Sequence, residues 1–204
     1  GAEGISLFLV DTSAEGVGVS SYNTMDSHSS STINLENVFV TEANLIVDEG
    51  EGFRHIESCL PQILLCLSAE ALGIMEVLNK LTVEYSKTRK QFGAPIGSFQ
   101  ALQHRMVDNF MAFEQSKSMV YRGICESTSF NKNDIDINQF LKTAHAVKAL
   151  IAKNSKQIGD ESIQIHGGIG MTDELNIGHF VKRLMMINVL FGDGDFHRQC
   201  FSQN

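Results

Sequence analysis

The chain has 204 residues, of which 43% are hydrophobic and 20% charged, a composition typical of ordinary globular proteins. Its formal net charge of -8 at pH 7 argues against general affinity for nucleic-acid phosphates. No uninterrupted apolar run approaches the ~20 residues that cross a bilayer, so we expect no membrane-spanning segment.

The cysteine pattern indicates a reducing environment. The four cysteines are Cys59, Cys66, Cys125 and Cys200, and no two of them have Cys-x-x-Cys spacing. Three lie in segments with helical apolar periodicity, which predicts buried, reduced thiols. We therefore expect a cytoplasmic protein, or a mitochondrial matrix protein in a eukaryote.

The N-terminal region, residues 5–47, has the short apolar patterns of β-strands. Ile5–Val10 predicts one strand, Val17–Tyr22 a second, and residues 33–40 a third with an irregularity at Glu36–Asn37. Three strands make a poor independent core, so we expect exposed apolar surface on this region. We also expect it to be the end of a larger β-domain that begins upstream of the chain.

From Gly52 onward the apolar period becomes helical, and four amphipathic helices are predicted. The first ends near Arg89, and Ser98 is the expected N-cap of the second. The third ends at the diglycine Gly167–Gly168, and the fourth begins near Thr172.

The predicted fold class is therefore mainly α. Short turns join the four helices, which favours an antiparallel four-helix bundle over residues 51–204. We expect residues 1–50 to form the truncated end of a β-domain that precedes the bundle.

The segment KTRKQFGAPIGSFQ, Lys87–Gln100, joins the first two predicted helices. The planar guanidinium of Arg89 is suited to pairing with a pyrophosphate. Phe92 is suited to packing against an adenine or flavin ring, and Gln100 to reaching the same ligand from the next helix. The alternative interpretation is a surface salt bridge, a core phenylalanine and a solvated glutamine.

A second candidate segment, QIHGGIG, spans Gln164–Gly170. Its glycines expose backbone N–H groups and allow a ligand to approach closely. The segment follows a helix rather than a strand, so it is not the Gly-rich turn of a Rossmann domain. The alternative interpretation is a simple helix stop.

A third segment, FGDGDFH, spans Phe191–His197 and places two acidic residues among glycines. In an apolar cleft, the Asp193 carboxylate would have a raised pKa and would be suited to act as a general base. The alternative is a solvated turn that caps the next helix. The seven histidines show neither His-x-x-x-His nor His-Glu-x-x-His spacing, so we expect no metal site.

Taken together, Lys87–Gln100, Gln164–Gly170 and the helix leading into Phe191–Asp193 resemble the acyl-CoA dehydrogenase family of flavoproteins. Residues 34–40 and 51–53 also look like that family's last β-strand and the entry to its C-terminal helices. The resemblance covers essentially the whole chain. It implies a β-domain followed by a four-helix bundle, FAD held at a subunit interface, and a helical domain upstream.

The resemblance also implies two sets of FAD contacts. One set, at the first bend, would touch the pyrophosphate, the cofactor rings and the adenosine half. The other set, at the end of the third helix, would touch the FAD of the partner subunit, so we expect a homo- or hetero-oligomer, dimer or tetramer. The first set is Arg89, Gln91, Phe92 and Gln100, and the second is Gln164, Gly167 and Gly168.

The reaction implied is α,β-dehydrogenation of an acyl-CoA thioester. In this family a carboxylate removes the α proton, a hydride from the β carbon passes to the flavin, and an electron-transfer flavoprotein takes the electrons. This chain would supply the C-terminal FAD-binding and oligomerisation part, and we expect it to be inactive alone.

The catalytic base departs from the family pattern. Many members carry a Glu in a Tyr-Glu-Gly-Thr turn, where this chain has Phe191-Gly192-Asp193-Gly194 and Gly192 falls on the base position. Other members carry the base on the first long helix, at a place corresponding to Ile63 here. Two alternatives follow: Asp193 is the base, or the chain is a base-less, non-catalytic partner subunit or assembly module of a heteromeric acyl-CoA dehydrogenase.

Overall fold

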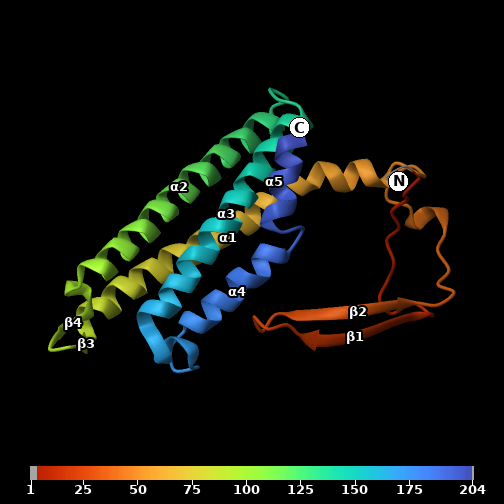
Figure 1. The fold of residues 1–204 in the computed structure, drawn as a ribbon. Helices are drawn as coiled ribbons and strands as arrows, with labels where there is room; N and C mark the ends of the chain where they lie inside the picture. Colours follow the sequence, from red (N-terminus) through yellow and green to blue (C-terminus); the bar gives the residue numbers. More distant parts are fainter. Residues whose placement is uncertain (1–3, 204) are drawn as a thin grey trace. The chain divides into compact units, whose positions relative to one another are not determined.

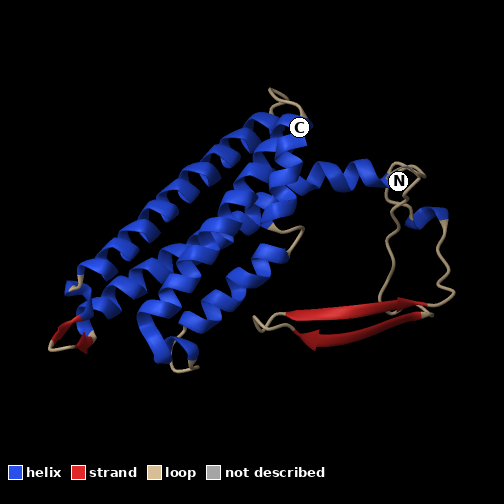
Figure 2. Cartoon of the chain, in the orientation of Figure 1, coloured by secondary structure: helices blue, strands red, loops and turns tan. Residues whose placement is uncertain are grey.

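The computed structural model describes residues 4–203, and the fold is mainly helical (Figures 1 and 2). The chain divides into two compact units, Gly1–Leu60 and Pro61–Asn204, which we describe separately. In chain order the strands and α-helices are β1 (Val17–Asn23), β2 (Ser29–Leu35), α1 (Gly52–Thr88), β3 (Lys90–Gln91), β4 (Ala94–Pro95), α2 (Gln100–Asn131), α3 (Ile137–His166), α4 (Ile177–Val189) and α5 (Gly194–Gln203).

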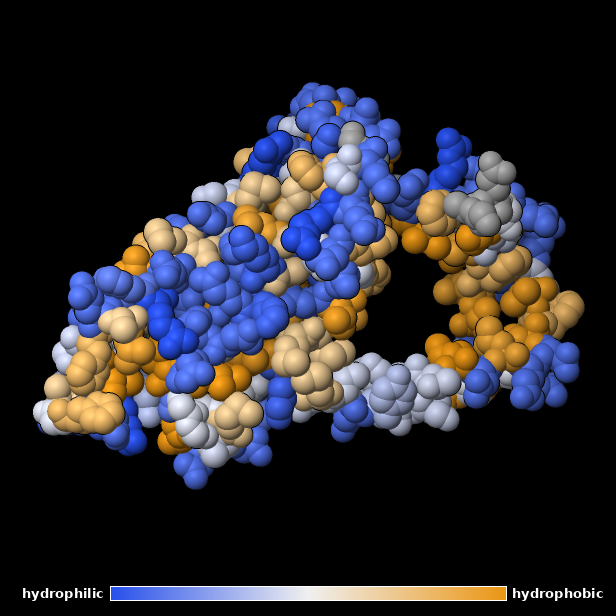
Figure 3. All heavy atoms as spheres, viewed as in Figure 1, coloured by the Kyte–Doolittle hydropathy of each residue, from blue (hydrophilic) through white to orange (hydrophobic). Residues whose placement is uncertain are grey.

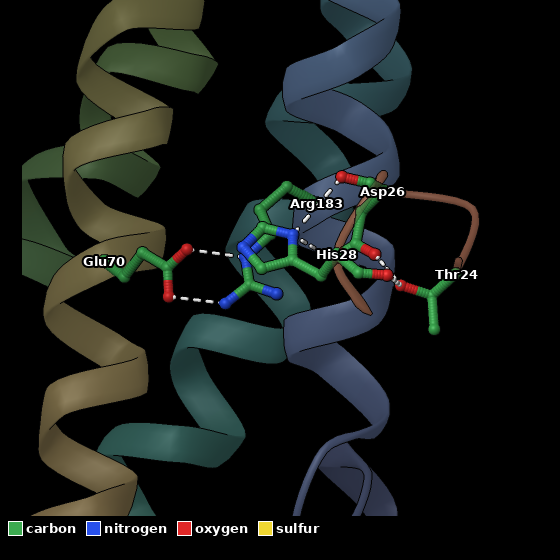
Figure 4. A network of polar contacts seen from close by, with 5 residues as sticks. All are labelled: Thr24, Asp26, His28, Glu70 and Arg183. Carbon is green, nitrogen blue, oxygen red and sulfur yellow. Dashed lines mark hydrogen bonds and ion pairs between the residues drawn. The ribbon is translucent and has the colours of Figure 1, made fainter. Parts of the chain in front are cut away.

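The N-terminal unit contains one antiparallel pair of strands. β1 pairs with β2 from Val17 opposite Leu35 to Asn23 opposite Ser29, which confirms the second predicted strand. Figure 4 shows the turn between them, where His28 Nδ1 lies 3.2 Å from the Asp26 carboxylate and Thr24 donates a hydrogen bond to the same side chain.

The other two predicted strands are partly wrong. Ile5–Val10 forms isolated bridges, Ile5 with Glu51 and Phe8 with Leu45, because no continuous partner strand runs beside it within the described residues. β2 runs from Ser29 to Leu35, so it begins before the predicted third strand at residues 33–40 and ends within it. The positive φ of 52° at Asn37 interrupts the extended backbone at the predicted irregularity.

Apolar side chains of the N-terminal unit remain exposed, as predicted. None of its hydrophobic side chains within residues 4–60 is buried. Phe39 is 86% exposed and Leu9 70%, and orange hydrophobic spheres mark this unit in Figure 3. Two paired strands and their connections therefore form no core of their own.

The helical unit is the predicted antiparallel bundle. Figure 1 shows the bundle helices side by side, with consecutive helices running in opposite directions. Buried apolar residues recur every three or four positions on each helix and meet in a common core. Core residues that are at most 2% exposed include Leu78 on α1, Val120 on α2, Phe140, Val147, Ile151 and Ile158 on α3, and Ile177, Leu184 and Ile187 on α4.

Polar contacts also join the helices across this core. Arg183 on α4 and Glu70 on α1 form a bidentate pair, with Nε–Oε1 and Nη2–Oε2 distances of 2.5 and 2.8 Å (Figure 4). The buried Asn154 side chain on α3 donates to the Ala112 carbonyl and to Ser116 Oγ on α2, both at 3.0 Å. These contacts fix the register of the helices against one another.

Helix ends agree with the sequence where glycine marks them and differ where a 3₁₀ turn intervenes. α3 ends at His166, and Gly167 follows with a φ of 65°, as predicted for the diglycine stop. Ser98 is not the N-cap of α2, because it lies in a 3₁₀ turn, Ile96–Ser98, and its hydroxyl donates to the Pro95 carbonyl. A second 3₁₀ turn, Gly167–Met171, delays the start of α4 beyond the predicted Thr172.

Helix α1 has the predicted bounds to within one residue, and it is strongly apolar. By length and composition alone it could cross a membrane, and it is the one such helix within residues 4–203. Only a third of its most apolar window is buried inside the chain, but that third includes Leu64, Ala71 and Met75 of the bundle core. Bundle packing accounts for these apolar positions.

The cysteine prediction is wrong in one respect. Cys59, Cys66 and Cys125 are exposed and Cys200 is half-buried, so none is a core thiol. The three exposed thiols fall on helix positions outside the buried stripe, which the coarse periodicity of their segments did not distinguish.

Candidate functional site

The bend after α1 is a small hairpin that presents several of the predicted ligand contacts. β3 and β4 pair through Lys90 and Pro95, and the hairpin is closed where Ile96 N–H donates to the Arg89 carbonyl at 2.8 Å. The Arg89 N–H itself donates to the Tyr85 carbonyl at 2.9 Å. The Arg89 backbone is thus held at the base of the hairpin, while its side chain is exposed.

Phe92 occupies the tip of this hairpin and is 94% exposed. Its φ of 54° is in the left-handed region, which costs a non-glycine residue roughly 1 kcal/mol. The ring has an edge contact with Phe99, with the ring centroids 6.1 Å apart. The alternative interpretation of Phe92 as a core residue is wrong for this chain, and Gln91 and Gln100 are also exposed.

The diglycine at the end of α3 leaves its backbone open. Gly167 has φ 65° and ψ -145°, and no other atom lies within 4 Å of where a Cβ would be at Gly167 or Gly168. Gln164, one turn earlier, is exposed. The Gly167 N–H donates to the Ile163 carbonyl, but the glycine backbone is exposed and carries no side chain, so a ligand can approach it closely.

Two residues that the sequence did not single out bring the hairpin end of α1 next to the end of α3. The Tyr85 ring stacks on the His166 ring, with centroids 4.3 Å apart and planes 25° apart. Tyr85 Oη also donates to the His166 carbonyl at 3.4 Å, and His166 Nδ1 lies 2.7 Å from the Ser162 carbonyl. The predicted contacts at Arg89 and at the diglycine therefore belong to the same end of the bundle.

A cleft of about 400 Å³ adjoins this aromatic stack. Its lining comes from α1, the end of α3 and the segment that leads into α4, and it includes the acidic residues Glu84 and Glu174 beside Tyr85, His166 and Asn176. The exposed Arg89 guanidinium and the exposed Phe92 ring belong to the same end of the bundle. A guanidinium is suited to pairing with a pyrophosphate.

Asp193 lies elsewhere, in the turn between α4 and α5. The 13 residues of α4 correspond to about 20 Å of helix, so this turn is separated from the diglycine end by the length of α4. Asp193 is exposed, and its Oδ1 accepts a hydrogen bond from Phe196 N–H at 2.8 Å. The carboxylate caps α5, as the alternative interpretation of this segment expected.

The turn itself has an unusual backbone. Phe191 and Gly192 have φ values of 58° and 108°. A Cβ on Gly192 would lie 2.4 Å from the Phe196 ring, so a side chain there would require the turn to move. A cleft of about 540 Å³ beside Asp193 is lined by apolar residues such as Leu150 and by basic side chains, namely Lys153, Lys156 and Arg198.

A buried lysine, which sequence reasoning missed, lies under this turn. Lys148 on α3 is fully buried, and its Nζ donates to the Ile187 carbonyl at 2.6 Å and to the Gly192 carbonyl at 3.5 Å. Burial lowers the pKa of Lys148 to about 8, and the negative charge of Asp193 opposes that shift. The sequence did offer a sign of this buried lysine, because Lys148 lies between Val147 and Ile151 in the apolar stripe of the third predicted helix.

Two histidines complete the buried cluster. His145 and His197 are both at most 4% exposed, and their Nδ1 atoms lie 2.7 Å apart. Burial lowers the pKa of His145. Burial, followed by the charges of His145 and Lys148, lowers the pKa of His197 to about 4. Both rings are therefore neutral at pH 7, and one donates to the other.

Within residues 4–203, no three His, Cys, Asp or Glu side chains are grouped so that they could hold a metal ion. Among these residues the bundle therefore offers two candidate regions for binding or chemistry, neither of them a metal site. One is the end that carries the hairpin and the diglycine, and the other is the turn that contains Asp193.

Comparison with known proteins identifies relatives over the whole chain. The family described as "Acyl-CoA dehydrogenase, C-terminal domain" matches residues 50–204. The 3-(aryl)acrylate reductase of Clostridium sporogenes (strain ATCC 15579) is 28% identical, over 100% of this chain and 53% of its own length. The probable acyl-CoA dehydrogenase YngJ of Bacillus subtilis (strain 168) is 30% identical, over 95% of this chain and 50% of its own.

A solved structure, "PigA with FAD and proline", superimposes on 100% of this chain and 52% of its own, with a TM-score of 0.88 and 26% identity. The chain therefore spans about half the length of the relatives it matches.

Proposed function

From the premise that this chain belongs to the acyl-CoA dehydrogenase family, we propose that it is the C-terminal FAD-binding and oligomerisation part of an FAD-dependent acyl-CoA dehydrogenase. The whole protein would remove hydrogens from the α and β carbons of an acyl-CoA thioester. Because the chain spans about half the length of its relatives, this activity would belong to the whole protein rather than to these residues alone.

One observation carries the proposal. Arg89 and the diglycine Gly167–Gly168, far apart in sequence, belong to the same end of the bundle through the contact of Tyr85 with His166. A superimposable structure is that of PigA with FAD and proline. An exposed guanidinium that can pair with phosphates and an exposed aromatic ring, at the same end of the bundle as the exposed diglycine backbone, support an FAD site.

We assign the FAD contacts by residue. Arg89 and Gln91 bind the pyrophosphate, Phe92 packs beside the cofactor, and Gln100 reaches the adenosine half. On the partner's FAD, the contacts come from the exposed end of α3. These are Gln164, Gly167 and Gly168. FAD supplies hydride-accepting chemistry when bound.

We further propose that Asp193 is the base that takes the α proton. Its carboxylate lies beside a cleft lined by apolar residues and by basic side chains, and one of its oxygens is oriented by the Phe196 N–H. Substrate acyl-CoA, an electron-transfer flavoprotein and a second copy or a homologous subunit are the partners on this proposal. Cys59, Cys66 and Cys125 are free thiols, so we propose a reducing compartment, the cytoplasm or, in a eukaryote, the mitochondrial matrix.

A second candidate function is a base-less partner subunit of a heteromeric dehydrogenase. Two observations favour it. Gly192 stands where many members carry the catalytic Glu, and the Asp193 carboxylate already caps α5. In that case the chain binds FAD or its partner without removing a proton.

The FAD site is tested by flavin fluorescence titration of the chain. Arg89→Ala is expected to weaken FAD binding about tenfold or more, because a charge-assisted hydrogen bond contributes ~1.5–3 kcal/mol. Lys87→Ala is the matched control, since Lys87 precedes the hairpin and pairs with Glu84 at 2.6 Å. Absence of FAD binding, or equal binding by Arg89→Ala and the native chain, would contradict the site.

The base is tested in the whole protein that carries this chain. Acyl-CoA turnover with an artificial electron acceptor is expected to fall at least about a hundredfold in Asp193→Asn, the size of a general-base contribution. Turnover that survives the substitution excludes Asp193 as the base. A flavin-loaded protein with no turnover of any acyl-CoA favours the base-less subunit.

A further inference from the structure

We propose that Lys148 is a positioning residue, which holds the turn Phe191–Asp193, and with it the Asp193 carboxylate, by donating hydrogen bonds to backbone carbonyls of α4 and the turn. The part of this inference that concerns a catalytic base rests on the proposed function. The contacts themselves do not.

The first argument is the hydrogen bonding at the end of α4. The last four carbonyls of an α-helix lack partners within the helix. The Ile187 carbonyl is one of these, and Lys148 Nζ donates to it at 2.6 Å. A cation at this end also interacts favourably with the helix dipole. Lys148 therefore caps α4 from inside the bundle.

The second argument is the reach of the same ammonium into the turn. Lys148 Nζ also donates to the Gly192 carbonyl at 3.5 Å, so one buried group joins α3 to both the helix end and the turn. Within the turn, Gly192 N–H donates to the Val189 carbonyl at 3.3 Å, and the buried His197 ring also interacts with the backbone of Phe191 and Gly192. The positive φ of Phe191, a non-glycine residue, needs support from the surrounding structure.

The third argument is the charge around Lys148. A fully buried ammonium is costly unless it is compensated. The titratable groups that face it are Asp193 from the turn, whose charge favours the ammonium, and His197 from α5, which pairs with His145 of α3. The paired histidines are neutral, so they add no repulsion at pH 7. The Asp193 charge therefore favours the buried ammonium, and the hydrogen bonds to the Ile187 and Gly192 carbonyls tie that ammonium to the turn.

Amide hydrogen exchange on the whole chain tests the positioning role. Lys148→Met keeps the length of the side chain and removes its charge and donors. The reporting amides are those of Gly192, Phe196 and His197, which are hydrogen-bonded within or just after the turn. In Lys148→Met we expect their protection to fall about tenfold, while amides in the middle of α2 keep theirs. Lys182→Met, the same change on α4, is the control and should leave the turn unchanged.

Unchanged protection of the turn in Lys148→Met would overturn the proposal. An equal loss throughout α2 and α3 would also overturn it, because Lys148 would then only stabilise the bundle. A second measurement uses the native chain, so it does not depend on the variant folding. After correction for intrinsic exchange, protection of Gly192 should fall between pH 7 and pH 9, because the neutral Lys148 amine still donates but forms weaker hydrogen bonds than the ammonium. A flat profile would overturn the role of the ammonium charge in holding the turn.

These experiments need neither flavin nor turnover. A chain that binds no FAD but loses protection in Lys148→Met would contradict the proposed function and leave the positioning role intact. Normal FAD binding, with unchanged protection of the turn in Lys148→Met, would support the proposed function and contradict the positioning role.

Discussion

At the scale of single residues, the buried ionisable cluster under the α4–α5 turn sets how the chain responds to pH. His145, Lys148 and His197 are at most 4% exposed, and each has its pKa lowered mainly by burial. A buried neutral histidine makes the folded state less stable in acid, because the unfolded chain binds the proton more readily than the folded protein does.

Acid should therefore destabilise the chain through His197. Its folded pKa is about 4 and its unfolded value is 6.5, so the stabilisation is complete above pH 6.5 and is lost as pH falls through 4. We expect the native chain to lose about 3 kcal/mol more than His197→Gln between pH 6.5 and 4, measured by urea unfolding. The exposed His104→Gln is the control and should follow the native curve. Parallel curves for the native chain and His197→Gln would refute this.

At the scale of elements, helix ends and cross-helix contacts position the candidate site. The end of α3 depends on a glycine conformation that other residues rarely adopt, and α3 is tied to α2 by a buried amide. The two features give separate predictions because one acts on backbone strain and the other on buried hydrogen bonding.

The two glycines of the diglycine should respond differently to alanine. Gly167 has φ 65° and ψ -145°, so Gly167→Ala is expected to destabilise the chain by about 1–3 kcal/mol. Gly168 has no positive φ and open space at its Cβ position, so Gly168→Ala should leave stability within about 0.5 kcal/mol. If the backbone approaches FAD there, Gly168→Ala should still weaken FAD binding. Thermal unfolding and flavin titration of both variants check this, and equal stability losses would contradict it.

Asn154 should be a major contributor to the α2–α3 interface. Its buried amide donates to the Ala112 carbonyl and to Ser116 Oγ, and both distances are 3.0 Å. Removing it breaks both bonds and leaves a small cavity, so Asn154→Ala should cost about 2–3 kcal/mol in chemical denaturation. The exposed Gln199→Ala controls for loss of an amide. A cost below about 0.5 kcal/mol would show that these bonds contribute little net stability.

At the scale of the whole molecule, the two units differ in how well each can be stable alone. The helical unit has a continuous core, whereas the N-terminal unit leaves its apolar side chains exposed. Exposed contiguous apolar surface marks an interaction surface or a tendency to aggregate.

The chain should therefore associate in solution. Light scattering at micromolar concentration is expected to give a mass above that of the monomer, because Phe39 and Leu9 are 86% and 70% exposed. The double variant Leu9→Ser, Phe39→Ser should shift the average mass toward the monomer. A native chain that scatters as a clean monomer would contradict the expectation.

Much of the helical fold was predictable from local patterns. Apolar periodicity located the four bundle helices, and the diglycine located the end of α3. The prediction of a strand at Ile5–Val10 was wrong, because a regular strand needs a continuous partner elsewhere in the chain and local sequence does not show whether one exists. Ser98 was a plausible cap by residue type, but the 3₁₀ turn that displaces it depends on how the hairpin closes.

In the candidate site, too, some features depend on local sequence and others on tertiary contacts. Residue chemistry and motif spacing were enough to identify the family and to propose Arg89 and the diglycine as ligand contacts, since these depend on side-chain types within short segments. Folding was needed to reveal the stack of Tyr85 on His166 and the placement of Lys148 under Gly192. Those contacts join residues on different elements, and helical periodicity reports which face a residue occupies but not which distant residue it meets.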